Sequence, residues 1–409
     1  MTTLSNHKPT AGELRADLTA RLVQQGLVAP GTPIESALRE VPRDRFVPGV
    51  PLADAYADTP VYTKYDGTGA NISAASQPGI VAMMLGQLDA QPGHAILEAG
   101  AGTGYNAALM GHIVGPAGRV VTIDVDEDLV DGARAHLTDA DVTNVTAILG
   151  DGALGHPEGA PYDRVIATVG AWEVPAPWLE QTARDGRLVV PVRLRGTASR
   201  SIAFERTRDA WSSVDSRLAV FMPLRGIGDD PRRTVHLTPE SDVALQIHKD
   251  QQADGTALAG IFTTPRHEAW TGARFGHTTS MEWMELWLSL TLPNPLMRMQ
   301  VQPAAKERGT VTPLFGWGAM ATTSGSSLAY LTSRRGQEDV EVGVVGHGPD
   351  GAALADQVAN QVQTFNTHWR NRTASFALPD PGTDLGSSTP GTGRFVLQRP
   401  HRPIVVTWE

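Results

Sequence analysis

The chain contains no cysteine among its 409 residues. This absence excludes disulfide bonds, zinc sites with thiolate ligands and a cysteine nucleophile. Long apolar runs are also missing, since no stretch approaches the roughly twenty apolar residues that a membrane-spanning helix needs. Residues 1–10 are polar and lack the apolar core of a secretion signal. We therefore expect a cytoplasmic protein with no membrane partner.

Positive charge is scarce relative to negative charge, with 34 Lys and Arg against 44 Asp and Glu. Nucleic-acid binding depends on neutralising phosphates, so this balance argues against a nucleic-acid partner. The histidines are scattered without metal-ligand spacing, and we expect no metal site. Five arginines lie close together in the sequence, and we interpret them as a solvated strand edge: Arg193, Arg195, Arg200, Arg206 and Arg208.

The most informative segment that is present is the glycine-rich run 97–106, L-E-A-G-A-G-T-G-Y-N, which follows a short apolar stretch. A strand that ends in glycines and turns into a helix lets a ligand approach bare backbone at the positive end of that helix. A second apolar run, 120–123, ends in Asp124, which is placed to bind the hydroxyls of a ribose. The segment therefore predicts a nucleoside-containing cofactor.

The spacing of the glycines favours one cofactor over another. Dinucleotide-binding turns usually read G-x-G-x-x-G, whereas this segment reads E-x-G-x-G-x-G and begins with Glu98. An acid there would repel a pyrophosphate but suits a ligand with an ammonium group, such as S-adenosyl-L-methionine. We therefore predict S-adenosyl-L-methionine and disfavour an NAD-linked dehydrogenase. A tight turn without a ligand would explain the glycines but not the two acids.

The residues around this segment alternate between strand-like and helix-like patterns. Apolar strands are predicted at 96–99, 120–124, 145–149, 164–169 and 187–192, with helices at 105–114, 129–137 and 178–182. This alternation predicts an α/β, Rossmann-like fold with a mostly parallel, doubly wound sheet. We also predict that Ser76 caps an apolar helix over 80–88, with Pro78 in its first turn.

The alternation stops near residue 196. Residues 199–222 are predicted to form antiparallel strands, and beyond 226 the pattern becomes that of a separate α+β module. That module contains an aromatic helix at 282–290, in which we expect Trp283 and Trp287 to pack in a core. We therefore predict two domains, 1–226 and 227–409, and find no chemical motif in the second.

Residues 11–225 resemble the protein-L-isoaspartate O-methyltransferases. The resemblance rests on several segments in the family's order: 45–48 (RFVP), 55–58 (AYAD), 76–82 (SQPGIVA), 97–106, 150–152 (GDG), 160–163 (APYD) and 186–191 (GRLVVP). It implies methyl transfer from S-adenosyl-L-methionine to a carboxylate of a peptide or protein bearing aspartate or isoaspartate.

The resemblance also implies a role for individual residues. Those expected to hold the methionine part of the cofactor are Glu98, Gly100, Gly102, Gly104 and Asn106. Those expected at the ribose and adenine are Asp124, Asp151 and Gly152. Ser76 matches the serine between the methyl group and the acceptor carboxylate, and we predict it as the catalytic residue. Those expected to contact the acceptor are Tyr62, Tyr65, Gln77 and Val169.

The chain departs from the family's pattern in two places. Residues 59–71 replace a short connection that borders the acceptor site, and residues 227–409 continue where the repair enzymes end. Extended homologues of this kind resemble methyltransferases of ribosomal-peptide gene clusters, which methylate an aspartate in a constrained peptide so that the ester cyclises to an aspartimide. We expect this function, with the second module recognising the peptide. Repair of isoaspartyl damage and a non-catalytic peptide-binding protein with a vestigial cofactor site are the alternatives.

Overall fold

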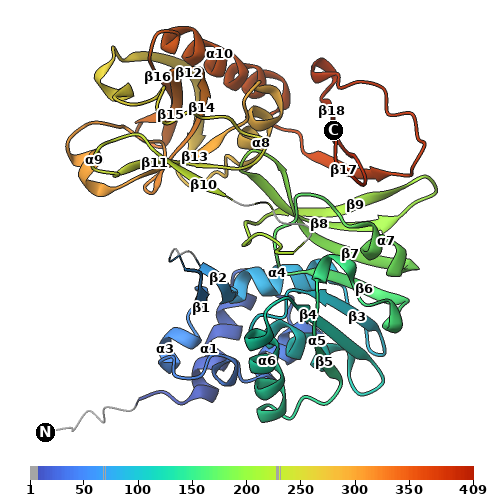
Figure 1. Cartoon of the computed structure of the whole chain (residues 1–409). Coiled ribbons are helices and arrows are strands. Elements are labelled where there is room, and N and C mark those ends of the chain that lie inside the picture. The colour runs from blue at the N-terminus through green and yellow to red at the C-terminus, as the bar shows by residue number, and fades with distance from the viewer. Residues whose placement is uncertain (1–7, 68, 70, 227–229, 231) are drawn as a thin grey trace, which may run out of the picture. The chain divides into compact units, whose positions relative to one another are not determined.

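The computed structural model describes residues 8–67, 69, 71–226, 230 and 232–409. The chain divides into two compact units, coloured along its length in Figure 1. The first comprises Met1–Val192, Arg200–Asp229 and Pro400–Arg402, and the second Arg193–Ser199, Asp230–Arg399 and Pro403–Glu409. The chain thus passes between the units several times, and each unit is described separately below.

The first unit is built on a mostly parallel sheet. Strands β3 (Ala95–Ala99), β4 (Arg119–Asp124), β5 (Val145–Leu149), β6 (Tyr162–Ala167) and β7 (Thr182–Arg195) lie in the order β5-β4-β3-β6-β7, and all four neighbouring pairs are parallel. Antiparallel strands β8 (Ala198–Arg206) and β9 (Ala210–Leu218) follow. The predicted Rossmann-like α/β fold is confirmed by the parallel order of these strands, and β3 and β4 are buried along nearly their whole length, as strands covered on both faces are.

The α-helices of the described part of the first unit are α1 (Ala11–Gln24), α2 (Pro33–Glu40), α3 (Leu52–Ala55), α4 (Pro78–Leu88), α5 (Tyr105–Val114), α6 (Glu127–Asp139) and α7 (Ala176–Gln181). Helix α5 packs on β3 and β4, α6 on β4 and β5, and α4 on β6. Their apolar faces form one core, in which Leu85 and Met110 are buried beside Ile96 of β3.

The segment that departs from the family's pattern forms an antiparallel hairpin of β1 (Val61–Tyr65) and β2 (Asn71–Ala75). Val61 lies opposite Ala75, and Lys64 lies opposite Ser73. Threonine and tyrosine suit extended backbone, which gives 61–65 strand character. The hairpin leads directly into α4 through Ser76 and Gln77.

The predicted cap of α4 is wrong. The residue at the N-terminal boundary of α4 is Gln77, and its side chain makes no capping hydrogen bond. The amide of Gly79 instead donates to a carboxylate oxygen of Asp58 at 2.7 Å. Because an acid distant in the sequence satisfies this backbone donor at the start of the helix, the helix has no need of the Ser76 hydroxyl.

The interpretation of the arginine cluster as a solvated edge is wrong for two members. Arg193 is 6% exposed and pairs with Asp230 at 2.5 Å and Asp250 at 2.7 Å, all in the second unit. Arg200 is 3% exposed and donates to the hydroxyl and carbonyl of Ser216. Both guanidinium groups are buried with partners, since an unpaired buried charge is costly.

The second unit contains an antiparallel sheet of seven strands in the order β10-β11-β13-β14-β15-β16-β12. These strands are β10 (Arg233–His236), β11 (Val243–Ile247), β12 (His267–Gly276), β13 (Met297–Val301), β14 (Gly318–Ser324), β15 (Ser327–Arg335) and β16 (Asp339–His347). Helix α10 (Gly351–Thr364) packs on β12, β15 and β16. The other helices are α8 (Glu282–Thr291) and α9 (Pro303–Glu307), and strands β17 (Ala374–Pro379), β19 (Ile404–Trp408) and β18 (Arg394–Leu397) pair antiparallel.

The tryptophans of the second unit pack against one another. Trp287 is 2% exposed, stacks on Trp369 with ring centroids 5.1 Å apart and meets Trp408 edge-on. Trp283 also meets Trp408 edge-on. The expectation of core packing is therefore confirmed for Trp287, whereas Trp283 is half-buried at the side of this cluster. Among the described residues, no helix has the length and apolar content needed to cross a membrane.

Candidate active site

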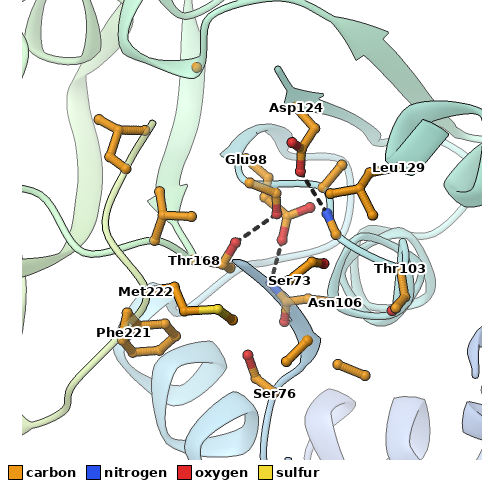
Figure 2. A pocket seen from close by; sticks show the side chains of 18 of the residues that line it. Ser73, Ser76, Glu98, Thr103, Asn106, Asp124, Leu129, Thr168, Phe221 and Met222 are labelled. Carbon is orange, nitrogen blue, oxygen red and sulfur yellow. Dashed lines mark hydrogen bonds between the residues drawn. The ribbon is translucent and has the colours of Figure 1, made fainter. Parts of the chain in front are cut away.

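A pocket in the first unit opens at the carboxyl ends of β3, β4 and β6. The sheet order reverses direction between β3 and β6, and open α/β sheets bind ligands at such a switch point. The pocket walls come from the glycine turn, the β4–α6 loop, residues 72–76, Thr168 with Val169, and residues 221–225. Figure 2 shows Ser76, Phe221 and Met222 toward one end of this pocket and Asp124 toward the other.

The glycine turn has a backbone that other residues rarely adopt. Gly100, Gly102 and Gly104 have φ values of 106°, 50° and 85°. A Cβ on Gly100 would lie 2.6 Å from the Thr168 hydroxyl, so this position also needs a bare backbone. Gly104 is the N-terminal boundary residue of α5, and the turn directs the start of that helix at the pocket. Gly100 and Gly102 line the pocket, so the backbone of this turn forms part of its wall, as the sequence predicts for a ligand-binding turn.

Glu98, at the end of β3, is a fully buried carboxylate. Its two oxygens accept hydrogen bonds from the Thr122 hydroxyl at 2.6 Å and the Asn106 amide at 2.7 Å. Burial raises the pKa of Glu98 to about 7, against the lowering effect of these two donors. A buried acid that lines a pocket and has a raised pKa suits a cationic ligand. The ammonium of S-adenosyl-L-methionine fits that requirement.

Asp124 is the last residue of β4 and is 8% exposed. One of its oxygens accepts from the Gly102 amide at 3.0 Å, as drawn in Figure 2, and the other from the Asp126 amide at 3.3 Å. These bonds fix the carboxylate at the pocket wall. Its remaining lone pairs can accept hydrogen bonds from a ribose diol.

Ser76 lies on the turn between β2 and α4 and lines the pocket. Arg43, which is fully buried, holds this turn by donating to the carbonyls of Ala75 at 3.2 Å and Ser76 at 2.9 Å. Asp58 holds the other side through Gly79 and through the Gln77 side chain at 3.2 Å. The sequence around Arg43 does not indicate this positioning role, because its partners lie far along the chain.

The structure brings eight of the predicted site residues together around the pocket: Ser76, Glu98, Gly100, Gly102, Asn106, Asp124, Gly152 and Val169. Five others lie outside the pocket lining: Tyr62, Tyr65, Gln77, Gly104 and Asp151. Asp151 caps a short turn by accepting from Ala153 at 2.9 Å. Tyr62 and Tyr65 are 49% and 57% exposed on β1.

Several pocket residues were not identified from the sequence. Ser73, Thr168, Phe221, Met222 and Arg225 all line the pocket. Thr168 could have been found, because it lies near the end of the strand predicted at 164–169 and directly follows β6, which ends at the switch point. Residues 221–225 follow an antiparallel strand and carry no local pattern that indicates a ligand.

The strand order, the glycine turn and the two buried acids together define a Rossmann-like methyltransferase that uses S-adenosyl-L-methionine. The sequence profile of the "Protein-L-isoaspartate(D-aspartate) O-methyltransferase (PCMT)" family matches residues 13–227. The chain belongs to the protein-L-isoaspartate O-methyltransferase family and is a carboxyl O-methyltransferase.

Individual relatives agree with this assignment. A protein-L-isoaspartate O-methyltransferase of Hyperthermus butylicus is 38% identical over 225 residues, covering 52% of this chain and 89% of that protein. One of Methanococcoides burtonii is 40% identical over 207 residues, covering 49% of this chain and 97% of that protein. A solved protein-L-isoaspartate O-methyltransferase structure aligns with a TM-score of 0.50 and 21% identity, over 90% of this chain and 96% of that one. The last comparison concerns the fold alone.

Proposed function

We propose that this enzyme methyl-esterifies an aspartate side chain in a ribosomally synthesised, modified peptide, and that the ester then cyclises to an aspartimide. The observation that carries the proposal is the position of Ser76, on the pocket wall at the end of a hairpin that departs from the family's pattern. A methyl acceptor reaching Ser76 would pass this hairpin. A second domain, proposed as residues 227–409, supplies further recognition of the peptide.

The chemistry requires little from the protein beyond placement. When bound, S-adenosyl-L-methionine supplies an electrophilic methyl group. The acceptor carboxylate is already ionised at neutral pH, because its ordinary pKa is near 4. No general base is therefore required, and holding the reactants in line accounts for most of the rate enhancement.

The chain's own residues divide this work between them. Glu98 and Asn106 hold the methionine part, Asp124 holds the ribose, and Gly152 with Asp151 lies at the adenine side. Ser76 orients the acceptor carboxylate with one hydroxyl. Phe221 and Met222 present apolar surface toward the Ser76 end and exclude water. Excluding water favours a reaction in which an anion and a cation neutralise each other.

The second step, closure of the methyl ester to the aspartimide, needs no further catalytic group. Esterification turns the side-chain carbonyl into a better electrophile. The backbone nitrogen of the following residue attacks that carbonyl, methanol leaves with the nitrogen's proton, and a five-membered succinimide closes. A constrained peptide that brings this nitrogen near the ester would favour closure.

Repair of isoaspartyl residues is the second candidate. The relatives from Hyperthermus butylicus and Methanococcoides burtonii are both named for isoaspartate. The solved protein-L-isoaspartate O-methyltransferase structure aligns with 90% of this chain. Residues 1–226 are little more than half of the chain, so this alignment extends into the second unit. The added length therefore does not by itself separate the two functions, and the hairpin at 61–75 is the stronger discriminator.

A competition between acceptors tests the proposal. The full-length enzyme is given S-adenosyl-L-methionine with a generic isoaspartyl peptide, or with a macrocyclic peptide that contains aspartate. We expect methyl ester and then a loss of methanol only for the macrocyclic peptide, detected by mass spectrometry. Efficient turnover of the isoaspartyl peptide, with none of the macrocyclic one, would establish repair instead.

A further inference from the structure

Lys64 ties the hairpin to the rim of the cofactor pocket. Its ammonium lies 2.9 Å from Oδ2 of Asp126 and 2.6 Å from Oδ1 of Asp128, and both acids are at the start of α6. Lys64 also lies opposite Ser73 in the hairpin, and Ser73 lines the pocket. The position of one pocket wall is therefore linked to the acids that follow β4.

A second cation reaches the same oxygen from another wall. Residues 219–226, which we call the strap, follow β9 and include the pocket residues 221–225. Gly170 holds the strap through two backbone hydrogen bonds, to the carbonyl of Met222 at 2.7 Å and from the amide of Leu224 at 2.8 Å. Arg225 of the strap lies 2.8 Å from Oδ2 of Asp126 and 3.7 Å from Asp124.

The end of the strap packs closely against Asp151, next to the pocket residue Gly152. Gly226 has a φ of 96°, and a Cβ on it would lie 2.4 Å from a carboxylate oxygen of Asp151. Only glycine allows the backbone to approach Asp151 so closely. The strap is thus held at Gly170, at Asp126 and against Asp151.

The ionic contacts at Asp126 are only partly open to solvent. The side chains of Lys64, Asp126 and Arg225 are 27%, 20% and 30% exposed. Burial alone would raise the pKa of Asp126, but the hydrogen bonds from Arg225 and Lys64 hold it below its usual value. Such a group is screened less by salt than a fully exposed pair.

Three walls of one pocket therefore meet at a single carboxylate. We propose that Asp126 is a positioning residue that keeps the pocket closed over the cofactor, holding the hairpin through Lys64 and the strap through Arg225, and that breaking these contacts is the step that allows the spent cofactor to leave. The hairpin also carries Tyr62 and Tyr65, so the same carboxylate links cofactor retention to the acceptor side.

The test measures the release of S-adenosyl-L-homocysteine, the product form of the cofactor, from the full-length enzyme. Labelled product is bound and then displaced with an excess of unlabelled product. We expect Asp126→Asn to release it at least tenfold faster, and Lys64→Met and Arg225→Met to release it up to about fivefold faster, as partly exposed ion pairs allow. The effects of Lys64→Met and Asp126→Asn should be less than additive, because the two variants share the Lys64–Asp126 contact, and what Lys64→Met adds reports its second contact with Asp128.

The matched control is Arg39→Met, which removes an equal charge from an ion pair with Glu35 on the surface of α2. We expect this variant to release product at the wild-type rate. High salt should accelerate release from the wild type and leave Asp126→Asn nearly unchanged, a response that general loosening of the fold would not produce. Unchanged release in Asp126→Asn, or equal acceleration by Arg39→Met, would overturn the proposal. No acceptor is present in this experiment, so its outcome is independent of the proposed function.

Discussion

At the scale of single residues, the buried carboxylate of Glu98 costs the fold stability when it is ionised and suits a cationic ligand. Its carboxylate is fully buried with two neutral donors, Thr122 and Asn106, and its pKa is raised to about 7. The folded state therefore binds a proton more tightly at this position than the unfolded chain does. Stability associated with Glu98 is present at low pH and is lost as the pH rises from the unfolded value toward 7.

The pH dependence of stability follows from this sign. Glu98→Gln cannot ionise, so the free energy of unfolding of this variant, relative to wild type without cofactor, should increase between pH 5 and pH 8. The increase is at most on the order of 3 kcal/mol. Urea denaturation at both pH values measures it. A difference between the two proteins that stays constant with pH would contradict a raised pKa at Glu98.

Asp124 gives a prediction about affinity. Asp124→Asn keeps an acceptor for the Gly102 amide but removes the charge that we propose binds the ribose. Hydrogen bonds to charged groups are worth roughly 1.5–3 kcal/mol, so the affinity for S-adenosyl-L-methionine should fall tenfold or more. Calorimetric titration measures the change. Asp139→Asn, on the exposed end of α6, serves as the control and should bind as the wild type does.

At the scale of elements, the turn between β2 and α4 is held in shape by residues other than Ser76. Asp58 satisfies the Gly79 amide and Arg43 holds the carbonyls of Ala75 and Ser76, so the turn keeps its shape without the Ser76 hydroxyl. A role for that hydroxyl in catalysis can therefore be tested with little effect on the helix.

Ser76→Ala should lower kcat for methyl transfer at least tenfold while changing the free energy of unfolding by less than about 0.5 kcal/mol, below the ordinary loss of a cap. Affinity for S-adenosyl-L-methionine should be unchanged. Asp58→Asn provides the opposite pattern, because weakening the acceptor for Gly79 lowers stability. Turnover and thermal unfolding measured on one preparation separate the two effects, and a normal kcat in Ser76→Ala would remove it from catalysis.

At the scale of the whole molecule, two hydrophobic cores are formed by different parts of the chain. One contains Leu85, Met110 and Ile96, and the other contains Leu245, Met299 and Tyr330. The cofactor pocket is lined by residues of the first unit. A ligand stabilises only the state, and hence the unit, that binds it.

Calorimetric unfolding should therefore resolve two transitions. S-adenosyl-L-methionine should raise the midpoint temperature of only the transition that belongs to the first unit. At a hundredfold excess over Kd, the gain in free energy is about 2.7 kcal/mol. Hydrogen exchange of peptides from α5 and from β13 identifies which transition belongs to which unit. A single transition that shifts as a whole would show that the two cores unfold together.

Much of the cofactor site could be predicted from the sequence because it is built locally. Glu98, the glycines and Asn106 occupy one strand–turn–helix segment, so their spacing along the chain already determines which backbone groups face a ligand. Asp124 follows the next strand, and parallel neighbours end at the same edge of the sheet. Resemblance to a known family supplied the roles of Ser76 and Asp151, which spacing alone does not indicate.

The tertiary structure decided what depends on residues distant in the sequence. Asp58, not Ser76, satisfies the start of α4, and buried acids, not solvent, surround Arg193. Lys64 and Arg225 meet at Asp126 only because the sheet and the strap bring three separate segments to one rim. Sequence patterns report periodicity and local backbone preference, so they determined the α/β fold and the glycine turn. Pairing between charges from distant segments is a property of the folded chain, which is why only the structure reveals how the pocket is closed.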